Sequence, residues 1–242
     1  MKSLIIIPSR MSATRLPGKP LMKINGVSII SHVFKRAQNA NIGEVIVATE
    51  DQEIIDEVKS KGGNAILTSR NHKTGTDRIY EALNIIGRND IDFIMNVQGD
   101  EPDVDIIDLK NLDSKMKKNN SKIGTLAAKI SKKETYKNVN VVKVKIRESF
   151  DKNSFPHAQN FMRITKENDN IFHHIGIYSY DIDTLKKFVS FNQSKNELKN
   201  NLEQLRALDN DININVALAK KSPIGIDTRE DYLAIKKIMK YK

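Results

Sequence analysis

Short apolar runs alternate with amphipathic stretches along the chain up to about residue 100. The runs SLIIIP, EVIVAT and DFIMNV are apolar at nearly every position, which is typical of strands that are buried on both faces of a parallel sheet. Between the first two runs, Ile30, Val33 and Ala37 recur at helical spacing and predict an apolar helix face. This alternation predicts an α/β fold, with a mostly parallel mixed sheet and helices on both faces.

The regular alternation of predicted strands and helices ends after about residue 122. The runs KIGTLAAKI, NVVKVKI and FHHIGIYSY predict strands with few helices between them, which favours a partly antiparallel region. NELKNNLEQLRALD predicts a helix, and Thr228 and Asp231 have the spacing of a capping box before a closing helix. Because there is no repeat and no long linker, we expect one domain over residues 1–242, with a smaller lobe at about 123–190 inserted in the α/β core.

Three polar clusters directly follow predicted strands. They are Ser9–Lys19, Thr68–Arg78 and Gln98–Asp103. Ligands of open α/β sheets bind beyond the carboxyl ends of the strands. The shared location of the three clusters therefore predicts a ligand site at this edge of the sheet.

Composition excludes several classes of protein. The 242 residues contain no Cys, which excludes a disulfide scaffold, a thiolate zinc site and a Cys nucleophile. No run approaches the roughly 20 apolar residues of a membrane span, and the apolar run at Leu4–Ile7 is too short for a signal peptide. We expect a cytoplasmic protein with no membrane partner.

The formal net charge of +10 raises the alternative of a nucleic-acid-binding protein. Most Lys residues are scattered among Asn, Glu and Asp, as on solvated helix faces, and there is no zinc-finger, RRM or KH motif. We expect no nucleic-acid partner. Steep salt-dependent binding of duplex DNA would favour this alternative.

The first polar cluster, RMSATRLPGK, concentrates cations and hydroxyls in one loop. It lacks the P-loop and G-x-G-x-x-G motifs, but guanidinium, ammonium, hydroxyl and backbone N–H groups can together surround a polyphosphate. The alternative is an ordinary surface loop. The candidate residues are Arg10, Ser12, Thr14, Arg15 and Lys19.

Two further motifs offer carboxylates. In NVQGDEP, Asp100 follows a buried strand, where it could hold Mg²⁺, and Gln98 could contact a base or a hydroxyl; a polar turn is the alternative. In GIDTREDY, Asp227 precedes a helix, and helix capping is the alternative. A shared metal site requires that Asp100 and Asp227 meet in space, which periodicity cannot establish.

The remaining motifs are weaker when they are taken singly. The adjacent histidines of HHIGIY face opposite sides of a strand, and NLEQLRAL has the pattern of an ordinary amphipathic helix. There is no histidine or cysteine spacing for zinc and no G-x-S-x-G elbow. A zinc enzyme, a serine hydrolase and a Rossmann dehydrogenase therefore have no support.

Taken together and in this order, the motifs IPSRMSATRLPGKPL, TSRNHKTGTDR, NVQGDEP, HIGIY, LEQLRAL and GIDTREDY resemble the 3-deoxy-manno-octulosonate (Kdo) cytidylyltransferase family, the CMP-Kdo synthetases. The resemblance covers nearly the whole chain. It implies a Rossmann-like fold with a small dimerisation lobe, a homodimer, and transfer of CMP from CTP to the anomeric hydroxyl of an acid sugar with Mg²⁺.

The resemblance also implies the roles of particular residues. Catalysis falls to Arg10, Arg15, Lys19, Asp100 and Asp227, of which the two aspartates hold the metal. The nucleotide contacts are Arg10, Ser12, Thr14, Arg15, Lys19, Arg78 and Gln98. The sugar contacts are Gln98, Arg163, His174, Tyr178, Glu203 and Gln204.

The chain departs from the family pattern in three places, one of which is His173, where the family usually has arginine or lysine. The family usually reads ARYASTRLPGKP, whereas here serine stands at Ser12 and alanine at Ala13. The segment from about 147 to 170 lacks the family's ALYFSR…IP…R pattern, and Arg163 is the only nearby candidate for its arginines. The acceptor could therefore be Kdo, a close analogue or another octulosonic or nonulosonic acid. An inactive homologue is a further alternative.

Overall fold

The computed structural model describes residues 1–12, 15–151 and 154–239. These residues form two compact units. The first comprises Met1–Leu109 and Pro223–Lys242, and the second comprises Lys110–Ser222. The predicted lobe at about 123–190 falls within the second unit, and its status as a separate lobe stays a prediction.

The first unit is built on a parallel sheet, as the apolar runs predicted. Its strands have the order β6-β1-β4-β5, and Ile5 of β1 pairs with Val45 on one side and with Met95 on the other. Every residue of β1 is buried, because this strand is covered on both faces. The strands are β1 (Ser3–Ser9), β4 (Gly43–Thr49), β5 (Asn64–Leu67) and β6 (Phe93–Asn96).

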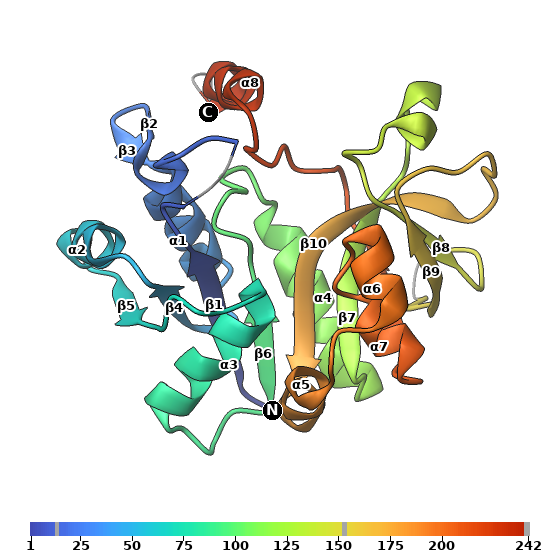
Figure 1. Ribbon diagram of the computed structural model, residues 1–242, viewed down its shortest axis with the longest axis horizontal. Helices are drawn as coiled ribbons and strands as arrows, with labels where there is room; N and C mark the ends of the chain where they lie inside the picture. Colours follow the sequence, from blue (N-terminus) through green and yellow to red (C-terminus); the bar gives the residue numbers. More distant parts are fainter. Residues whose placement is uncertain (13–14, 152–153, 240–242) are drawn as a thin grey trace. The chain divides into compact units, whose positions relative to one another are not determined.

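Three helices cover this sheet. α1 (Ile29–Asn39) and α2 (Gln52–Ser60) contact each other on one face, and α3 (Gly75–Ile86) packs on β1 and β4 from the other face (Figure 1). Local sequence fixes the ends of α3. Thr74 and Asp77 form a capping box at its start, and Gly87 ends it in the left-handed region at a φ of 64°. The prediction of an α/β fold with helices on both faces is confirmed.

The end of the chain returns to the first unit as α8 (Arg229–Met239). Buried side chains of this helix form one core cluster with Ile24 and Ile29, beside the short strands β2 (Lys23–Ile24) and β3 (Val27–Ser28). The hydroxyl of Tyr232 donates a 2.6 Å hydrogen bond to the carbonyl of Lys23. The predicted capping box is confirmed, since Thr228 and Asp231 exchange side-chain and backbone hydrogen bonds.

The second unit is partly antiparallel, as predicted. Strand β10 pairs antiparallel with β7 and β8, β8 pairs antiparallel with β9, and β11 runs parallel to β7. The β7 pairing shifts register between Ile175 and Tyr178. The strands are β7 (Ile123–Ala128), β8 (Lys143–Ile146), β9 (Ala158–Met162), β10 (Ile171–Asp181) and β11 (Ile214–Leu218).

The helices of the second unit differ from the prediction at one place. NELKNNLEQLRALD was expected to form one helix, but it is divided between α6 and α7, because Asn201 adopts the left-handed region at a φ of 51° and caps α6. Asparagine tolerates this conformation better than most residues. α6 spans Lys195–Asn200 and α7 spans Leu205–Asp209. The further helices of the described residues are η1 (Lys19–Leu21), α4 (Ile106–Asn119), η2 (Lys133–Lys137) and α5 (Ile182–Ser190). Of these, α4 begins in the first unit and ends in the second.

None of the helices in the described ranges is long and apolar enough to cross a membrane.

Candidate active site

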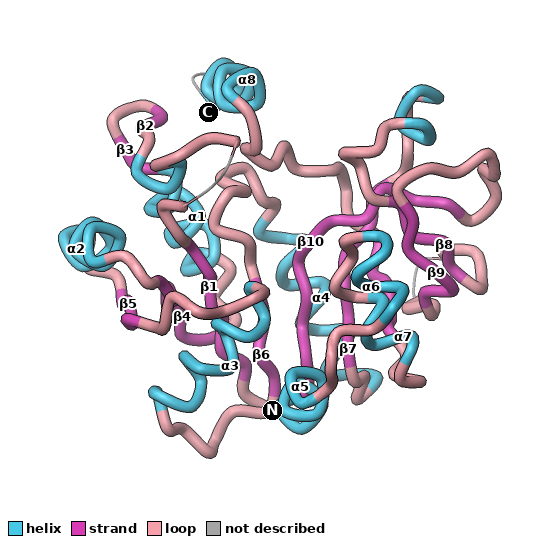
Figure 2. Tube along the Cα trace, in the orientation of Figure 1, coloured by secondary structure: helices cyan, strands magenta, loops and turns pink. Residues whose placement is uncertain are grey.

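The three polar clusters line one cavity of about 310 Å³ in the first unit. They belong to segments that follow β1, β5 and β6, most of which are loops (Figure 2). In a parallel sheet, the carboxyl ends of these strands share one edge, and this brings the segments together. The cavity is lined by Arg10, Arg15, Lys19, His72, Thr74, Arg78, Gln98 and Asp100, together with Asp227 from the segment before α8.

The ammonium group of Lys19 joins the two aspartates of the cavity. Its Nζ lies 2.7 Å from Oδ2 of Asp100 and 3.5 Å from Oδ1 of Asp227. Arg15 also contacts Asp227, at 2.9 Å from Nη2 to Oδ2. Asp100 and Asp227 do meet in space, and the capping box of α8 is formed by Thr228 and Asp231 rather than by Asp227. The N–H of Ile226 donates to the carbonyl of Asp100 at 2.9 Å, which fixes the two segments side by side.

This pair of carboxylates is suited to a hard divalent cation. Mg²⁺ binds to proteins through one or two carboxylates and takes its other oxygens from phosphates and water. Asp100 and Asp227 would supply this number of ligands. In the part of the chain that the structure describes, no group of three or more His, Cys, Asp or Glu side chains is placed to hold a metal ion. The ammonium of Lys19 already places a positive charge against both carboxylates.

Glu101 follows Asp100 and is buried. Burial, together with the charges of Asp100 and Asp227, raises the pKa of Glu101 to about 8. Its Oε2 has no hydrogen-bond partner among the described residues. At neutral pH the side chain is therefore mainly protonated, so it adds little negative charge beside the two aspartates.

Gly99 brings the cavity wall close to the end of β1. A Cβ at this position would lie 2.9 Å from the carbonyl oxygen of Pro8 and 3.3 Å from the side chain of Ser9. Only a glycine fits here without a shift of the backbone. The neighbouring Gln98 donates from Nε2 to Oδ1 of Asn96 at 3.1 Å, which orients its amide at the cavity.

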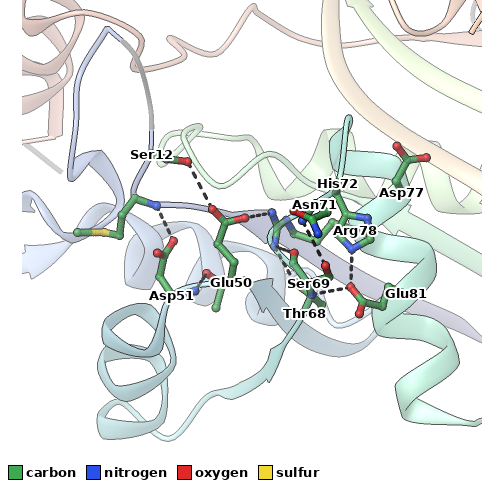
Figure 3. Close-up of polar contacts among 12 residues, drawn as sticks. Ser12, Glu50, Asp51, Thr68, Ser69, Asn71, His72, Asp77, Arg78 and Glu81 are labelled. Carbon is green, nitrogen blue, oxygen red and sulfur yellow. Dashed lines mark hydrogen bonds and ion pairs between the residues drawn. The ribbon is translucent and has the colours of Figure 1, made fainter.

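Arg78 lies in the wall of the cavity with only 4% of its side chain exposed. Its guanidinium pairs with the carboxylate of Glu50 and donates to Oγ1 of Thr68 at 2.6 Å and to the carbonyl of Ser69 at 3.2 Å (Figure 3). These contacts hold the planar group in one orientation. A predicted nucleotide-binding residue is thus firmly placed at the cavity.

His72 is a cavity residue that the sequence analysis did not single out, although it lies within the motif TSRNHKTGTDR. Its Nε2 contacts the carboxylate of Glu81, which also accepts the N–H of Ser69 at 2.8 Å (Figure 3). Burial acts to raise the pKa of Glu81, but these hydrogen bonds outweigh it and lower the pKa below its usual value. An ionised Glu81 therefore anchors His72 at the cavity.

The opening loop is the segment after β1 that carries the cations, residues 10–19. Its remaining predicted residues are described only in part. Oγ of Ser12 lies 3.5 Å from Oε1 of Glu50. Thr14 lies outside the described residues, so its predicted phosphate contact stays a prediction. Glu50 and its neighbour Asp51 were also missed by the sequence analysis. The available signal was a pair of acidic residues directly after a buried strand, at the same edge of the sheet as the other clusters.

The predicted sugar residues other than Gln98 lie in the second unit. The hydroxyl of Tyr178 lies 2.9 Å from Nε2 of His174, and Thr125 lies 3.1 Å from the same nitrogen. Burial lowers the pKa of His174 to about 3, so its ring is neutral. Burial also raises the pKa of Tyr178, and the nearby charges of Tyr180 and Glu203 add to this. His174 and Tyr178 therefore form one buried polar pair near the half-buried Glu203, and Gln204 is a buried residue at the start of α7.

Arg163 differs from this group, because its guanidinium is held by backbone carbonyls. Nε donates to Asn200 at 2.9 Å, Nη1 to Val139 at 3.1 Å and Nη2 to Asn201 at 2.8 Å. These contacts give Arg163 a structural task in joining β9 to the end of α6. Its predicted contact with the sugar stays a prediction.

Comparisons with known proteins agree with the motifs. The sequence model of the family described as Cytidylyltransferase matches residues 4–214. The chain is 41% identical to a 3-deoxy-manno-octulosonate cytidylyltransferase of Thermodesulfovibrio yellowstonii, over 96% of this chain and 95% of the relative. It is 39% identical to the protein of the same name from Afipia carboxidovorans, over 98% and 96%.

Solved structures are similar over the whole chain. A CMP:2-keto-3-deoxy-manno-octonic acid synthetase complexed with CTP has a TM-score of 0.89 and 32% identity, over 100% of this chain and 99% of that chain. A 4-diphosphocytidyl-2C-methyl-D-erythritol synthase of Anaerococcus prevotii has a TM-score of 0.66 and 14% identity, over 99% and 98%, and shares the fold alone.

Proposed function

The chain belongs to the 3-deoxy-manno-octulosonate cytidylyltransferase family, and we propose that it transfers CMP from CTP to the anomeric hydroxyl of Kdo or a close analogue, releasing pyrophosphate. The observation that carries the proposal is the meeting of Lys19, Asp100 and Asp227 in a cavity also lined by Arg10 and Arg15. Cations and carboxylates in one cavity fit a triphosphate with its metal ion.

The triphosphate of CTP binds among Arg10, Arg15 and Lys19 in this proposal. Guanidinium groups bind phosphate oxygens in bidentate fashion, and an ammonium adds a point charge. Arg78 has a different role, because its guanidinium is already held by Glu50 and Thr68. It supports the wall against which the nucleotide lies.

Asp100 and Asp227 would hold Mg²⁺, which when bound neutralises the charge of the phosphates. A cytidylyltransferase calls for a divalent cation, and the two carboxylates together with phosphate oxygens fit the preferences of Mg²⁺.

The reaction is a displacement at phosphorus. The anomeric oxygen of the sugar forms a bond to the α-phosphorus of CTP, and the bond from this phosphorus to the oxygen bridging to the β-phosphate breaks. The hydroxyl proton passes to solvent, and the bonding electrons leave with pyrophosphate. In such reactions an enzyme mainly positions the reactants and stabilises charge. Arg15 and Lys19 would stabilise the charge that develops on the departing pyrophosphate.

The acid sugar binds through the second unit in this proposal. His174 and Tyr178 contact each other in a buried polar group near Glu203, and with Gln204 they offer hydrogen-bonding partners for a sugar carboxylate and hydroxyls. The predicted sugar contact of Gln98 stays a prediction. The altered segment at about 147–170 leaves the acceptor open among Kdo and related acid sugars. The homodimer and the cytoplasmic location stay predictions.

The test is pyrophosphate release with Mg²⁺ and each of the four nucleoside triphosphates, with and without Kdo. Release only with CTP and Kdo together supports the proposal. CTP binding without release would refute Kdo as the acceptor, and other 2-keto acid sugars would then be tried. An absence of CTP binding, with salt-dependent binding of duplex DNA, would overturn the proposed activity itself.

A further inference from the structure

Two consecutive acidic residues, Glu50 and Asp51, connect separate parts of the cavity wall. They follow β4 directly, and each carboxylate contacts a different segment (Figure 3). Asp51 Oδ2 accepts the backbone N–H of Met11 at 2.7 Å, and the carboxylate of Glu50 pairs with Arg78. One dipeptide thus joins the opening loop after β1 to helix α3.

Asp51 makes this contact instead of a local one. It occupies the N-cap position of α2, where an aspartate usually accepts a backbone N–H of the first helical turn. Here its side chain makes no capping hydrogen bond. Its own N–H donates to Oγ1 of Thr49 at 3.2 Å, which fixes the backbone so that the carboxylate faces the opening loop.

The contact lies at the base of the loop that carries the cations. Met11 follows Arg10, and its carbonyl accepts the N–H of Gly18 at 3.1 Å. The N–H of Met11 therefore holds the start of the loop against Asp51. Its carbonyl holds the start of the loop against Gly18, the residue before Lys19. Releasing the Met11 N–H from Asp51 loosens the loop at the point where Arg10 and Lys19 are set.

Glu50 performs a parallel task on the other wall. Its side chain is 10% exposed and that of Arg78 is 4% exposed, so the ion pair is largely shielded from water and from salt. The other oxygen of Glu50 lies 3.5 Å from the hydroxyl of Ser12. The two acidic residues thus approach the opening loop at adjacent positions, Met11 and Ser12.

We infer that Glu50 and Asp51 are positioning residues for the nucleotide: Asp51 holds the opening loop through the Met11 N–H, and Glu50 holds Arg78. This inference rests on the proposed function. It assigns neither residue a contact with CTP, since Glu50 acts through Arg78, which lines the cavity, and Asp51 acts through Met11, the neighbour of the cavity residue Arg10.

The test compares Asp51→Ala and Asp51→Asn with Asp56→Ala. Asp56 is an exposed acidic residue on the same helix, α2, where it accepts a hydrogen bond from Gln52 at 2.8 Å. Asp51→Ala removes the acceptor for Met11, and we expect the KM and the Kd for CTP to rise about tenfold or more. The KM for the acid sugar stays within about twofold, since the acceptor's proposed residues are not held by this contact.

The conservative variant and a structural readout separate positioning from helix capping. An asparagine still offers an oxygen to Met11, so Asp51→Asn recovers most of the CTP affinity. Hydrogen exchange at the Met11 amide becomes faster in Asp51→Ala and stays at the wild-type rate in Asp56→Ala. Glu50→Gln keeps an acceptor for Arg78 without the charge, and we expect it to raise the KM for CTP with little change in the KM for the sugar.

Two results would overturn the inference. One is an Asp51→Ala protein with a lowered Tm but an unchanged KM for CTP, because a simple helix cap would behave in this way. The other is equal loss of affinity in Asp51→Ala and Asp56→Ala. Failure of the proposed function is distinguishable from both, since the wild-type protein itself would then neither bind CTP nor release pyrophosphate.

Discussion

The ammonium of Lys19 lies 2.7 Å from the carboxylate of Asp100 and 3.5 Å from that of Asp227. The two aspartates come from distant parts of the sequence, and one cation holds both. Together with Arg15, which pairs with Asp227 at 2.9 Å, Lys19 balances the two negative charges before any ligand binds. The arrangement also places both carboxylates at the cavity where the triphosphate and its metal are proposed to bind.

Asp100→Asn should leave the fold nearly unchanged, because the amide still accepts a hydrogen bond from Lys19 and this aspartate is only partly buried. Turnover with Mg²⁺ should fall by at least about a hundredfold, since one charged metal ligand is lost. The measurement is pyrophosphate release at saturating CTP, with circular dichroism as the control for folding. Wild-type turnover in this variant would remove Asp100 from the metal site.

Gly99→Ala should destabilise the protein, because the new Cβ would lie 2.9 Å from the carbonyl oxygen of Pro8. We expect a loss of about 1–3 kcal/mol in the free energy of unfolding and weaker CTP binding, since the cavity wall must shift. Urea unfolding and calorimetric titration measure the two effects. Gly225→Ala is the matched control, because a Cβ there has no atom within 4 Å. Equal behaviour of the two variants would contradict the close approach at Gly99.

The stability of the protein should depend on the neutral ring of His174. Burial lowers the pKa of His174 from 6.5 to about 3 in the folded protein, so between these values the unfolded chain binds one more proton at this site. The free energy of unfolding is therefore not reduced by His174 above about pH 6.5. It decreases as the pH falls from 6.5 towards 3, because the unfolded chain then gains a proton that the folded protein does not bind.

The measurement compares urea unfolding of the wild-type protein and His174→Gln between about pH 7 and about pH 5. The wild-type free energy of unfolding should fall more steeply, by up to about 1.4 kcal/mol per pH unit. Glutamine keeps a polar partner for Tyr178 and does not titrate. Identical slopes for the two proteins would show that His174 is not kept neutral by the fold.

Arg206→Ala should be strongly destabilising. Its guanidinium donates to Glu197 at 2.6 and 2.8 Å, and the two side chains are only 3% and 4% exposed. Removing the cation leaves a buried carboxylate without its charge partner, at a cost of about 3–5 kcal/mol in the free energy of unfolding. Lys186→Ala, which breaks an exposed pair with Asp183 at 3.8 Å, should change the free energy of unfolding by no more than about 0.5 kcal/mol. Similar losses in both variants would contradict the role of burial.

The sequence predicts the parallel sheet and the gathering of the three polar clusters, because continuous apolar strands and their carboxyl ends follow a general rule of α/β folds. It does not predict the meeting of Asp227 and Asp100, which depends on the packing of α8 against β2 and the start of α1. The break at Asn201 was missed because periodicity does not register one residue in the left-handed region.

The contacts of Asp51 and Arg163 could not be predicted for a related reason. An aspartate before a helix predicts a cap, yet Asp51 bonds to Met11, which lies far away in the sequence. Arg163 was expected at the sugar, which stays a prediction, and no sequence pattern indicated that its guanidinium donates to three backbone carbonyls. Both sets of contacts join residues that are far apart in the sequence, so local sequence patterns do not predict them.

The central claim is transfer of CMP to an acid sugar rather than simple hydrolysis of CTP. The most direct measurement is ³¹P NMR of a reaction of the purified protein with CTP, Mg²⁺ and Kdo, with mass spectrometry of the product. The account predicts one phosphodiester CMP–Kdo product for each pyrophosphate released. Pyrophosphate accompanied by free CMP from the first time points, or no change in the CTP signals, would contradict it.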